Sequence, residues 1–408
     1  MTAVPLRRNR DFLLLQAGQL LSGIGTQTGL IAYPLLVLAL TGSAAKAGLV
    51  SFARALSSTV LALPAGVVAD RWDRRRLMIG ADATRVLAVG ALAAAILSDR
   101  LAFWIIPVVA FVEGSGAAVF VAAEAGALRA VVPVRQLPGA AGARSGRMAA
   151  VWLAGPPLGG ALFGIARVLP FLVDAVSYAF STVSLLAMRT PFQQERQPDR
   201  SSLRSRLAEG ARYLWGHRFL RTCAFLFGLA NFIGPGVLLA LVVLGQRQGL
   251  SGGRVGLLVA VFGGCLLLGS FLSPLVRRLL PVRGVLVLEL WTWTGCALFL
   301  IWPDVYVLAA AILPTALAIP STDSVVHGYR IAMTPDRLVG RVESIWSTIS
   351  LLIAPLGPLV AGLLLDNASA RAAIAVFATF GLMLAVWGTL SPSIRTAPSL
   401  KELDGLPA

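Results

Sequence analysis

Long apolar runs alternate with short polar segments along almost the whole chain. An α-helix needs about 20 apolar residues to cross the roughly 30 Å hydrocarbon core of a bilayer. Only helices satisfy the backbone hydrogen bonds of such a run in lipid. The pattern predicts twelve spans: 12–40, 47–69, 77–97, 102–124, 140–166, 170–188, 220–245, 254–276, 284–302, 305–327, 342–365 and 371–390. We therefore expect an all-α integral membrane protein.

The composition excludes a soluble protein and changes the meaning of the charge. The chain is 57% hydrophobic and only 13% charged, whereas a soluble domain averages about 25% charged residues. The net charge of +16 would fit a nucleic-acid-binding protein. However, the basic residues lie between apolar runs and not on one soluble face, so we expect a lipid bilayer and no nucleic acid as partner. The first apolar run is too long for a cleaved signal peptide and is taken as the first span.

Basic residues follow the sidedness of the predicted spans. The termini and the loops that follow even-numbered spans hold 27 of the 35 Lys and Arg residues, and the opposite side holds six. Loops rich in Lys and Arg stay in the cytoplasm. We therefore predict a multi-pass protein of the bacterial inner membrane with both termini in the cytoplasm.

The longest polar stretch divides the spans six and six. We predict an N-terminal bundle over 1–188, a cytoplasmic linker over 189–219, a C-terminal bundle over 220–393 and a cytoplasmic tail over 394–408. The linker contains an amphipathic portion, about 203–215, that is expected to lie on the inner membrane surface.

The two halves also repeat at an offset of 202 residues. Five positions match, and repeated bundles of this kind are typical of transporters. The matching pairs are Pro133 with Pro335, Arg135 with Arg337, Gly155 with Gly357, Pro156 with Pro358 and Gly160 with Gly362.

The segment from Gly66 to Arg75, GVVADRWDRR, carries a recognisable motif. It is similar to G-x-x-x-D-R-x-G-R-R, the signature of the loop between spans two and three in the major facilitator superfamily, with Asp73 in place of the second glycine. The form DRWDRR, the opening FLLLQAGQLLSGIGTQ and the segment LALTGSAAKAGLV resemble the drug:proton antiporter branch that includes macrolide and enterobactin exporters. The resemblance covers essentially the whole chain and implies twelve helices in two pseudo-symmetric six-helix bundles.

The resemblance implies a latch at the inner gate, formed by Gly66, Asp70, Arg71, Arg74 and Arg75. Asp70 would face the other bundle near the start of span eleven, about 338–343, and the arginines would pair with nearby acids. A carboxylate gains from the free N–H groups at a helix N-terminus. The alternative is that the arginines serve only as a topology signal.

A second motif of the antiporters, G-P-x-x-G-G, is complete in span five. Glycines let helices approach closely and prolines remove backbone donors, so we expect a hinge and packing surface here and in the matching part of span eleven. The residues are Gly155, Pro156, Gly159 and Gly160, with Gly357, Pro358 and Gly362 in the second half.

Ionisable residues inside spans are candidates for proton coupling. Glu113, near the middle of span four, is either the coupling site or a structural hydrogen-bonding group. Drug antiporters of other branches carry an arginine three residues earlier, where this chain has Ala110. Glu113 must therefore find another cation, and Arg54 in span two is the obvious one, unless it extends to the outer membrane interface.

Three further candidates remain open. Asp174 pairs with Arg54 or Arg167, or admits protons. Asp323 pairs with Arg330 or acts at the inner gate. Asp82 and Arg85 are expected to form a local i, i+3 pair.

Several polar and aromatic positions are candidates for a substrate cavity. A polar stripe in span one recurs at helical spacing, and the other positions lie in spans five, seven and eleven: Gln19, Ser22, Thr26, Asn231, Trp152 and Trp346.

We therefore expect a secondary active transporter, a monomer, that exports a small amphiphilic molecule against inward proton flow. Substrate classes implied by the resemblance are an antibiotic, a natural product or a siderophore. The alternatives are a lipid or lysophospholipid flippase and a non-transporting membrane sensor or scaffold. The sequence has no nucleotide-binding loop, metal spacing or nucleophile–base set, so no enzyme, metal or cofactor is predicted.

Overall fold

The computed structural model describes residues 5–190, 192, 203–335 and 338–397. This part of the chain contains twelve helices long and apolar enough to cross a membrane, which confirms the expected all-α architecture. Parts of the predicted linker (191 and 193–202) and tail (398–408), and Arg337 of the repeat, lie outside the described residues.

Two compact units make up the chain. The first unit comprises Met1–Gln197 with Val242–Ala260, and the second comprises Pro198–Leu241 with Val261–Ala408. Each is described by itself below.

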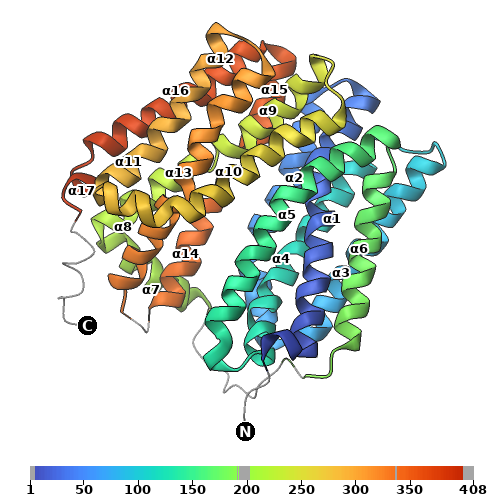
Figure 1. Cartoon of the computed structure of the whole chain (residues 1–408), viewed down its shortest axis with the longest axis horizontal. Coiled ribbons are helices and arrows are strands. Elements are labelled where there is room, and N and C mark those ends of the chain that lie inside the picture. Colours follow the sequence, from blue (N-terminus) through green and yellow to red (C-terminus); the bar gives the residue numbers. More distant parts are fainter. Residues whose placement is uncertain (1–4, 191, 193–202, 336–337, 398–408) are drawn as a thin grey trace. The chain divides into compact units, whose positions relative to one another are not determined.

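Six long helices form most of the first unit (Figure 1). They coincide with the first six predicted spans to within a few residues, except that the fourth, predicted to end at 124, continues to Val131. The helices are α1 (Arg10–Thr41), α2 (Ala44–Arg71), α3 (Arg74–Leu97), α4 (Ile105–Val131), α5 (Leu137–Ile165) and α6 (Leu169–Ala187).

Local capping sets where these helices begin and end. Asn9 accepts a hydrogen bond from the backbone N–H of Phe12 at the start of α1. Gly42 ends the helix with φ of 66°, a left-handed conformation that favours glycine. Asp73 caps α3 by accepting from the N–H of Arg76 at 2.8 Å. This role explains the aspartate in the loop motif, because Asp is among the best N-cap residues.

Packing within the first unit places α1 against α5 and α6, α2 against α4, and α3 against both α4 and α6. At one end, a core cluster joins the start of α1 and α3 to the ends of α4 and α6. Asp11 strengthens this junction, since its carboxylate accepts from the backbone N–H groups of Arg189 and Thr190. These contacts therefore join the ends of α1, α3, α4 and α6 next to the α2–α3 turn.

The second unit has more interruptions in its helices. Its elements are α7 (Leu203–Gly216), α8 (Arg218–Ala230), α9 (Ile233–Arg247), α10 (Gly252–Leu279), α11 (Val282–Thr292), a 3-10 turn (Trp293–Ala297), α12 (Leu298–Ile301), α13 (Val305–Ala332), α14 (Val339–Leu352), α15 (Leu356–Asn367), α16 (Ala370–Leu390) and α17 (Pro392–Arg395). The end of α9 and the start of α10 are the exception, since they fall in Val242–Ala260, which groups with the first unit.

Spans seven and eleven are each broken into two helices. The break between α8 and α9 meets the break between α14 and α15, because the Asn231 side chain donates to the carbonyl of Ser350 at 2.8 Å. Gly357 lies against the carbonyl of Phe232 at the same place. An interrupted helix leaves backbone carbonyls without helical partners, and a side-chain amide can satisfy one of them.

The amphipathic part of the predicted linker is the helix α7, and it packs against α14. Tyr213 donates to the carbonyl of Met333, and Glu209 forms an ion pair with Arg341. Burial raises the pKa of the Tyr213 phenol. These contacts tie α7 to the turn that leads into α14.

Candidate functional site

The centre of the first unit contains a buried carboxylate. Glu113, in the middle of α4, is 1% exposed. The next residue, Gly114, lets α2 approach closely, since a Cβ there would collide with the carbonyl of Arg54 and the hydroxyl of Ser57. This close contact brings the side chain of Arg54 to that of Glu113.

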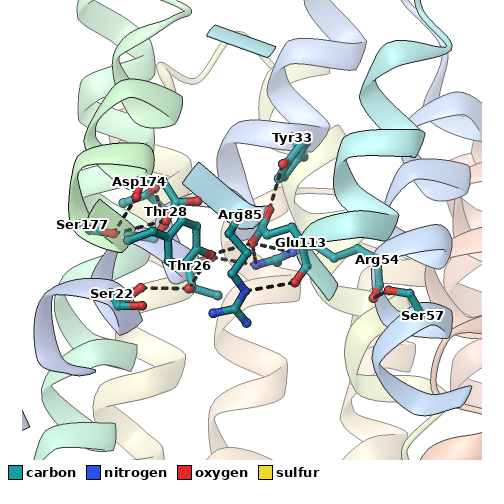
Figure 2. A network of polar contacts seen from close by, with 12 residues as sticks. Ser22, Thr26, Thr28, Tyr33, Arg54, Ser57, Arg85, Glu113, Asp174 and Ser177 are labelled. Carbon is teal, nitrogen blue, oxygen red and sulfur yellow. Dashed lines mark hydrogen bonds and ion pairs between the residues drawn. The ribbon is translucent and has the colours of Figure 1, made fainter. Parts of the chain in front are cut away.

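Glu113 is fully engaged by donors from three helices (Figure 2). One oxygen, Oε1, accepts from Nη2 of Arg54 at 2.7 Å and from Nε at 3.2 Å. It also accepts from the Tyr178 hydroxyl of α6 at 3.2 Å. The other oxygen, Oε2, accepts from the Tyr33 hydroxyl of α1 at 2.8 Å. The ionised carboxylate is therefore stabilised by a buried cation and two phenols.

Arg54 is the cation that the sequence analysis expected for Glu113, and it does not extend to an interface. Its side chain is 19% exposed. Its Nη2 also donates to the backbone carbonyl of Thr26 in α1 at 2.9 Å. Arg54 thus joins α1, α2 and α4 through one guanidinium group.

A second ion pair lies beside the first. Arg85 and Asp82 of α3 form the predicted i, i+3 pair at 3.2 Å, and both are buried. The guanidinium of Arg85 lies 4.9 Å from the centre of the Tyr178 ring. Its Nε donates to the backbone carbonyl of Glu113 at 3.3 Å. The pair is therefore part of the same polar interior and not only a local contact.

Asp174 of α6 differs from both expected pairings. It is 2% exposed, and among the described residues it forms no ion pair with Arg54, Arg167 or any other cation. Its carboxylate is 3.5 Å from the Ser177 hydroxyl. Gly25 of α1 lies against it, since a Cβ there would be 2.5 Å from Oδ1 of Asp174. Arg54 does not pair with Asp174, because its guanidinium already donates to the carboxylate of Glu113 and to the carbonyl of Thr26.

The polar stripe of span one faces α6. Gln19 donates to the hydroxyl of Ser181 at 3.2 Å, and the hydroxyl of Thr26 is 2.8 Å from that of Tyr178. Ser22 is 3% exposed, and its carbonyl accepts from Thr26. The structure therefore adds contacts with hydroxyl groups of α6 to Gln19 and Thr26, and the expectation that this stripe faces a central cavity stays a prediction.

The arginines of the loop motif have different partners. Arg74 forms an ion pair with Asp70 at 3.6 Å, and the Asp70 side chain is 59% exposed. Arg75 was expected to pair with an acid. It donates instead to the carbonyls of Leu185 and Leu186 at 2.9 and 2.7 Å. These carbonyls belong to the last turn of α6, where a cation is favoured by the helix dipole.

Two positions of the predicted latch, Gly66 and Arg71, have few neighbours among the described residues. Nothing described lies within 4 Å of a Cβ built on Gly66. The side chain of Arg71 is exposed and makes no hydrogen bond or ion pair with the described residues.

The G-P-x-x-G-G segment forms a close helix contact in the first unit. A Cβ on Gly155 would collide with Gln27, and one on Gly159 would lie 2.5 Å from the carbonyl of Thr28. Pro156 and Gly160 are buried in the same helix, which remains one continuous α5. The matching segment Gly357, Pro358 and Gly362 is buried in α15, and there the span breaks just before the segment.

In the second unit, Arg330 pairs with Glu343 at 2.6 Å and not with Asp323. The guanidinium of Arg330 also lies 4.7 Å from the ring of Trp346, which is 7% exposed. Asp323 is exposed. Trp152 of α5 is partly buried. The described residues contain no group of three or more His, Cys, Asp or Glu that could hold a metal ion.

Sequence reasoning missed several of these groups. Tyr33 lies seven residues after Thr26, so a helical repeat could have placed both on one face. Tyr178 lies one turn after Asp174, but nothing in its spacing indicated Glu113 as its partner. The buried pair of Glu124 with Arg147, 2.6 Å apart, joins α4 to α5 and was also missed.

Comparisons with known proteins agree with the fold and the motifs. The sequence profile of the Major Facilitator Superfamily matches residues 17–288 and 222–405. The multidrug efflux pump Tap of Mycolicibacterium fortuitum is 26% identical, and the match covers 96% of this chain and 97% of that protein. Macrolide efflux protein A of Streptococcus pyogenes is 23% identical over 87% of this chain and 89% of that protein.

Among solved structures, a bacterial homologue of the human lysosomal transporter Spinster, in an inward-facing and unoccupied conformation, is similar. Its TM-score is 0.74 with 16% identity, and the match covers 100% of both chains. The two curated relatives are drug exporters by name, which agrees with the branch that the loop motif indicated. The matched profile covers most of the chain, and the described residues contain twelve helices long and apolar enough to cross a membrane, so the chain belongs to the major facilitator superfamily, a family of transporters and not of enzymes.

Proposed function

We propose that this chain exports a small amphiphilic molecule by proton antiport, and that Glu113 is the residue at which the proton acts. The curated relatives are named for efflux of multiple drugs and of macrolides. An antibiotic or a similar natural product is therefore the substrate class that we favour over a siderophore.

The charge balance of the buried cluster is the observation that carries the proposal. Two cations, Arg54 and Arg85, share the interior of the first unit with three acids, Glu113, Asp82 and Asp174. A net charge buried away from water is costly. The cluster is neutral when one of the three carboxyl groups carries a proton, so the site is suited to exchange one proton.

The contacts of Arg54 supply a way for that proton to change the protein. When Glu113 is ionised, it holds the guanidinium at Oε1. A proton on this oxygen removes the negative charge and one acceptor site, which frees Arg54 to turn towards the neighbouring Asp174. Because Arg54 also binds the carbonyl of Thr26, its movement alters the contact of α1 with α2 and α4. We propose Asp174 as the group through which protons reach Glu113.

Transport would proceed by alternating access of the two units. The latch residues Gly66, Asp70, Arg71, Arg74 and Arg75 would hold the inner side closed, and Asp323 would act at the same gate. The segments around Gly155 and Gly357 would serve as hinges. A ligand can shift such a two-state equilibrium only by binding the two states differently.

The proposed cargo is neutral or weakly cationic and lipophilic. Trp152, Trp346 and Asn231 are the proposed cargo contacts outside the first helix. The excess of basic residues in the termini and in the loops after even-numbered spans supports placing both termini in the cytoplasm.

The test is a susceptibility panel in a bacterial host that lacks its own efflux pumps. The host expresses the wild type, Glu113→Gln or Asp99→Asn, at matched levels. Asp99 is exposed beyond the end of α3, so its substitution is a matched neutralisation of an acid outside the cluster. We expect the wild type and Asp99→Asn to raise the inhibitory concentration of at least one amphiphilic drug, and Glu113→Gln not to.

Two outcomes would count against the proposal. Unchanged susceptibility across the panel with the wild type would reject drug export, and would favour a sensor or scaffold. Full resistance with Glu113→Gln would remove Glu113 from the coupling mechanism.

A further inference from the structure

A groove of about 810 Å³ opens on the first unit, beside the loop motif. All of its lining residues belong to that unit, from the α2–α3 turn, α3 and α4. Apolar side chains, among them Leu77, Phe111 and Val119, line its length. Along α3 the groove extends from Arg76 to Thr84, about 12 Å at 1.5 Å per residue. This is close to the thickness of the hydrocarbon of one bilayer leaflet, about 15 Å.

One end of the groove is cationic. Four arginines lie between positions 71 and 76, and of these Arg74 is held by Asp70 and Arg75 by the end of α6. The other two, Arg71 and Arg76, line the groove. Their side chains are exposed and make no hydrogen bond or ion pair with the described residues.

The remaining groups at this end favour a lipid headgroup. Asp73 also lines the groove, and Oδ1 of its carboxylate accepts from the N–H of Arg76 in capping α3, but Arg71 and Arg76 outnumber this one acid. Trp72 is 64% exposed, and tryptophan gathers at membrane–water interfaces. Basic pockets beside membrane helices bind the headgroups of anionic lipids. The end is cationic and interfacial, and the rest of the groove is apolar.

We propose that this groove binds an anionic phospholipid of the adjacent leaflet, with its phosphate at Arg76 and Arg71 and an acyl chain along α3 and α4. The inference goes beyond the proposed function and does not depend on which cargo is exported.

The groove also borders residues of α4 that lie next to the buried site. Gly116 lines it, and a Cβ on Gly116 would lie 2.8 Å from Nε of Arg85. Val112, which precedes Glu113 on α4, lines it as well. A bound lipid therefore packs against the helix segment that carries Glu113, so its presence can favour one arrangement of that segment over another.

The test is native mass spectrometry of the full chain in mild detergent, titrated with phosphatidylglycerol or with phosphatidylcholine. Gly80 lines the groove, and nothing lies within 4 Å of a Cβ built there. Gly80→Leu therefore fills the groove without a clash in the unit. Gly90→Leu is its matched control, because Gly90 is on the same helix, has the same free space and does not line the groove.

Arg76→Gln tests the headgroup contact, with Arg129→Gln as control for the loss of an exposed arginine. We expect Arg76→Gln to weaken phosphatidylglycerol binding about fivefold, in line with the attraction of one basic residue near an anionic surface. It should weaken phosphatidylcholine binding less, because the choline cation offsets the charge of the phosphate. We expect Gly80→Leu to reduce binding of both lipids, and both controls to match the wild type.

Equal phosphatidylglycerol binding by Gly80→Leu and Gly90→Leu would overturn the proposal. So would equal weakening by Arg76→Gln and Arg129→Gln, since the effect would then be one of overall charge. If Gly80→Leu abolished binding of an exported drug and left lipid binding intact, the groove would belong to the cargo and the proposal would be wrong.

Discussion

The pair of Arg54 and Glu113 shows how a single residue contact can be both stable and switchable. Removing two charges from water is costly, and their attraction compensates only if the geometry is good and the remaining polar atoms are satisfied. Here both carboxylate oxygens have donors, and the guanidinium has a backbone acceptor as well. A change in the charge of either partner therefore has a large effect on the local structure.

This coupling predicts non-additive stability at the residue scale. Arg54→Gln leaves a buried carboxylate with only two phenol donors, and Glu113→Gln leaves a buried guanidinium. Breaking a buried pair by removing one partner costs about 3–5 kcal/mol. We expect each single variant to lower the midpoint of thermal unfolding in detergent, and the double variant to lower it by less than the sum. Additive effects would show that the two side chains do not depend on each other.

The sequence predicted part of this residue network. Glu113 needed a cation, Ala110 could not provide one, and Arg54 was the nearest charged candidate within a span. The phenols of Tyr33 and Tyr178 could not be predicted, because only the packing of the helices brings their hydroxyls to Glu113. Among the described residues Asp174 forms no ion pair, because the guanidinium of Arg54 is already held by Glu113 and by the carbonyl of Thr26.

At the scale of elements, glycines determine how closely helices pack. The motif G-P-x-x-G-G predicted a packing surface, and α5 does lie against α1 at Gly155 and Gly159. The same sequence pattern predicted equal behaviour in the second half, yet α5 is continuous while span eleven is broken. Proline position alone could not reveal this, since the break depends on partners such as Asn231 that satisfy the freed carbonyls.

Substitutions along α5 test the packing role. Gly155→Leu forces a side chain against Gln27 of α1, and overpacking of this kind typically costs about 1–3 kcal/mol. Gly164→Leu is the matched control on the same helix, because nothing lies within 4 Å of a Cβ built on Gly164. We expect Gly155→Leu to lower both thermal stability and drug resistance, with Gly164→Leu close to the wild type. Equal behaviour of the two variants would contradict the close α1–α5 contact.

At the scale of the whole molecule, hydropathy was the most informative signal. The twelve spans were predictable to within a few residues in most cases because lipid imposes a simple length and composition on each helix. The grouping of the chain into two units was less predictable in detail. The segment Val242–Ala260 groups with the first unit, although the linker divides the spans six and six, because contacts and not chain order decide the grouping.

The most direct test of proton-coupled export uses purified protein in lipid vesicles with an acidic interior and a pH-sensitive dye inside. A drug to which the wild type confers resistance is added outside. The account predicts that the drug dissipates the pH gradient in wild-type vesicles, and that Glu113→Gln binds the drug but leaves the gradient unchanged. Dissipation by Glu113→Gln at the wild-type rate, or drug uptake by the wild type without any change in pH, would contradict it.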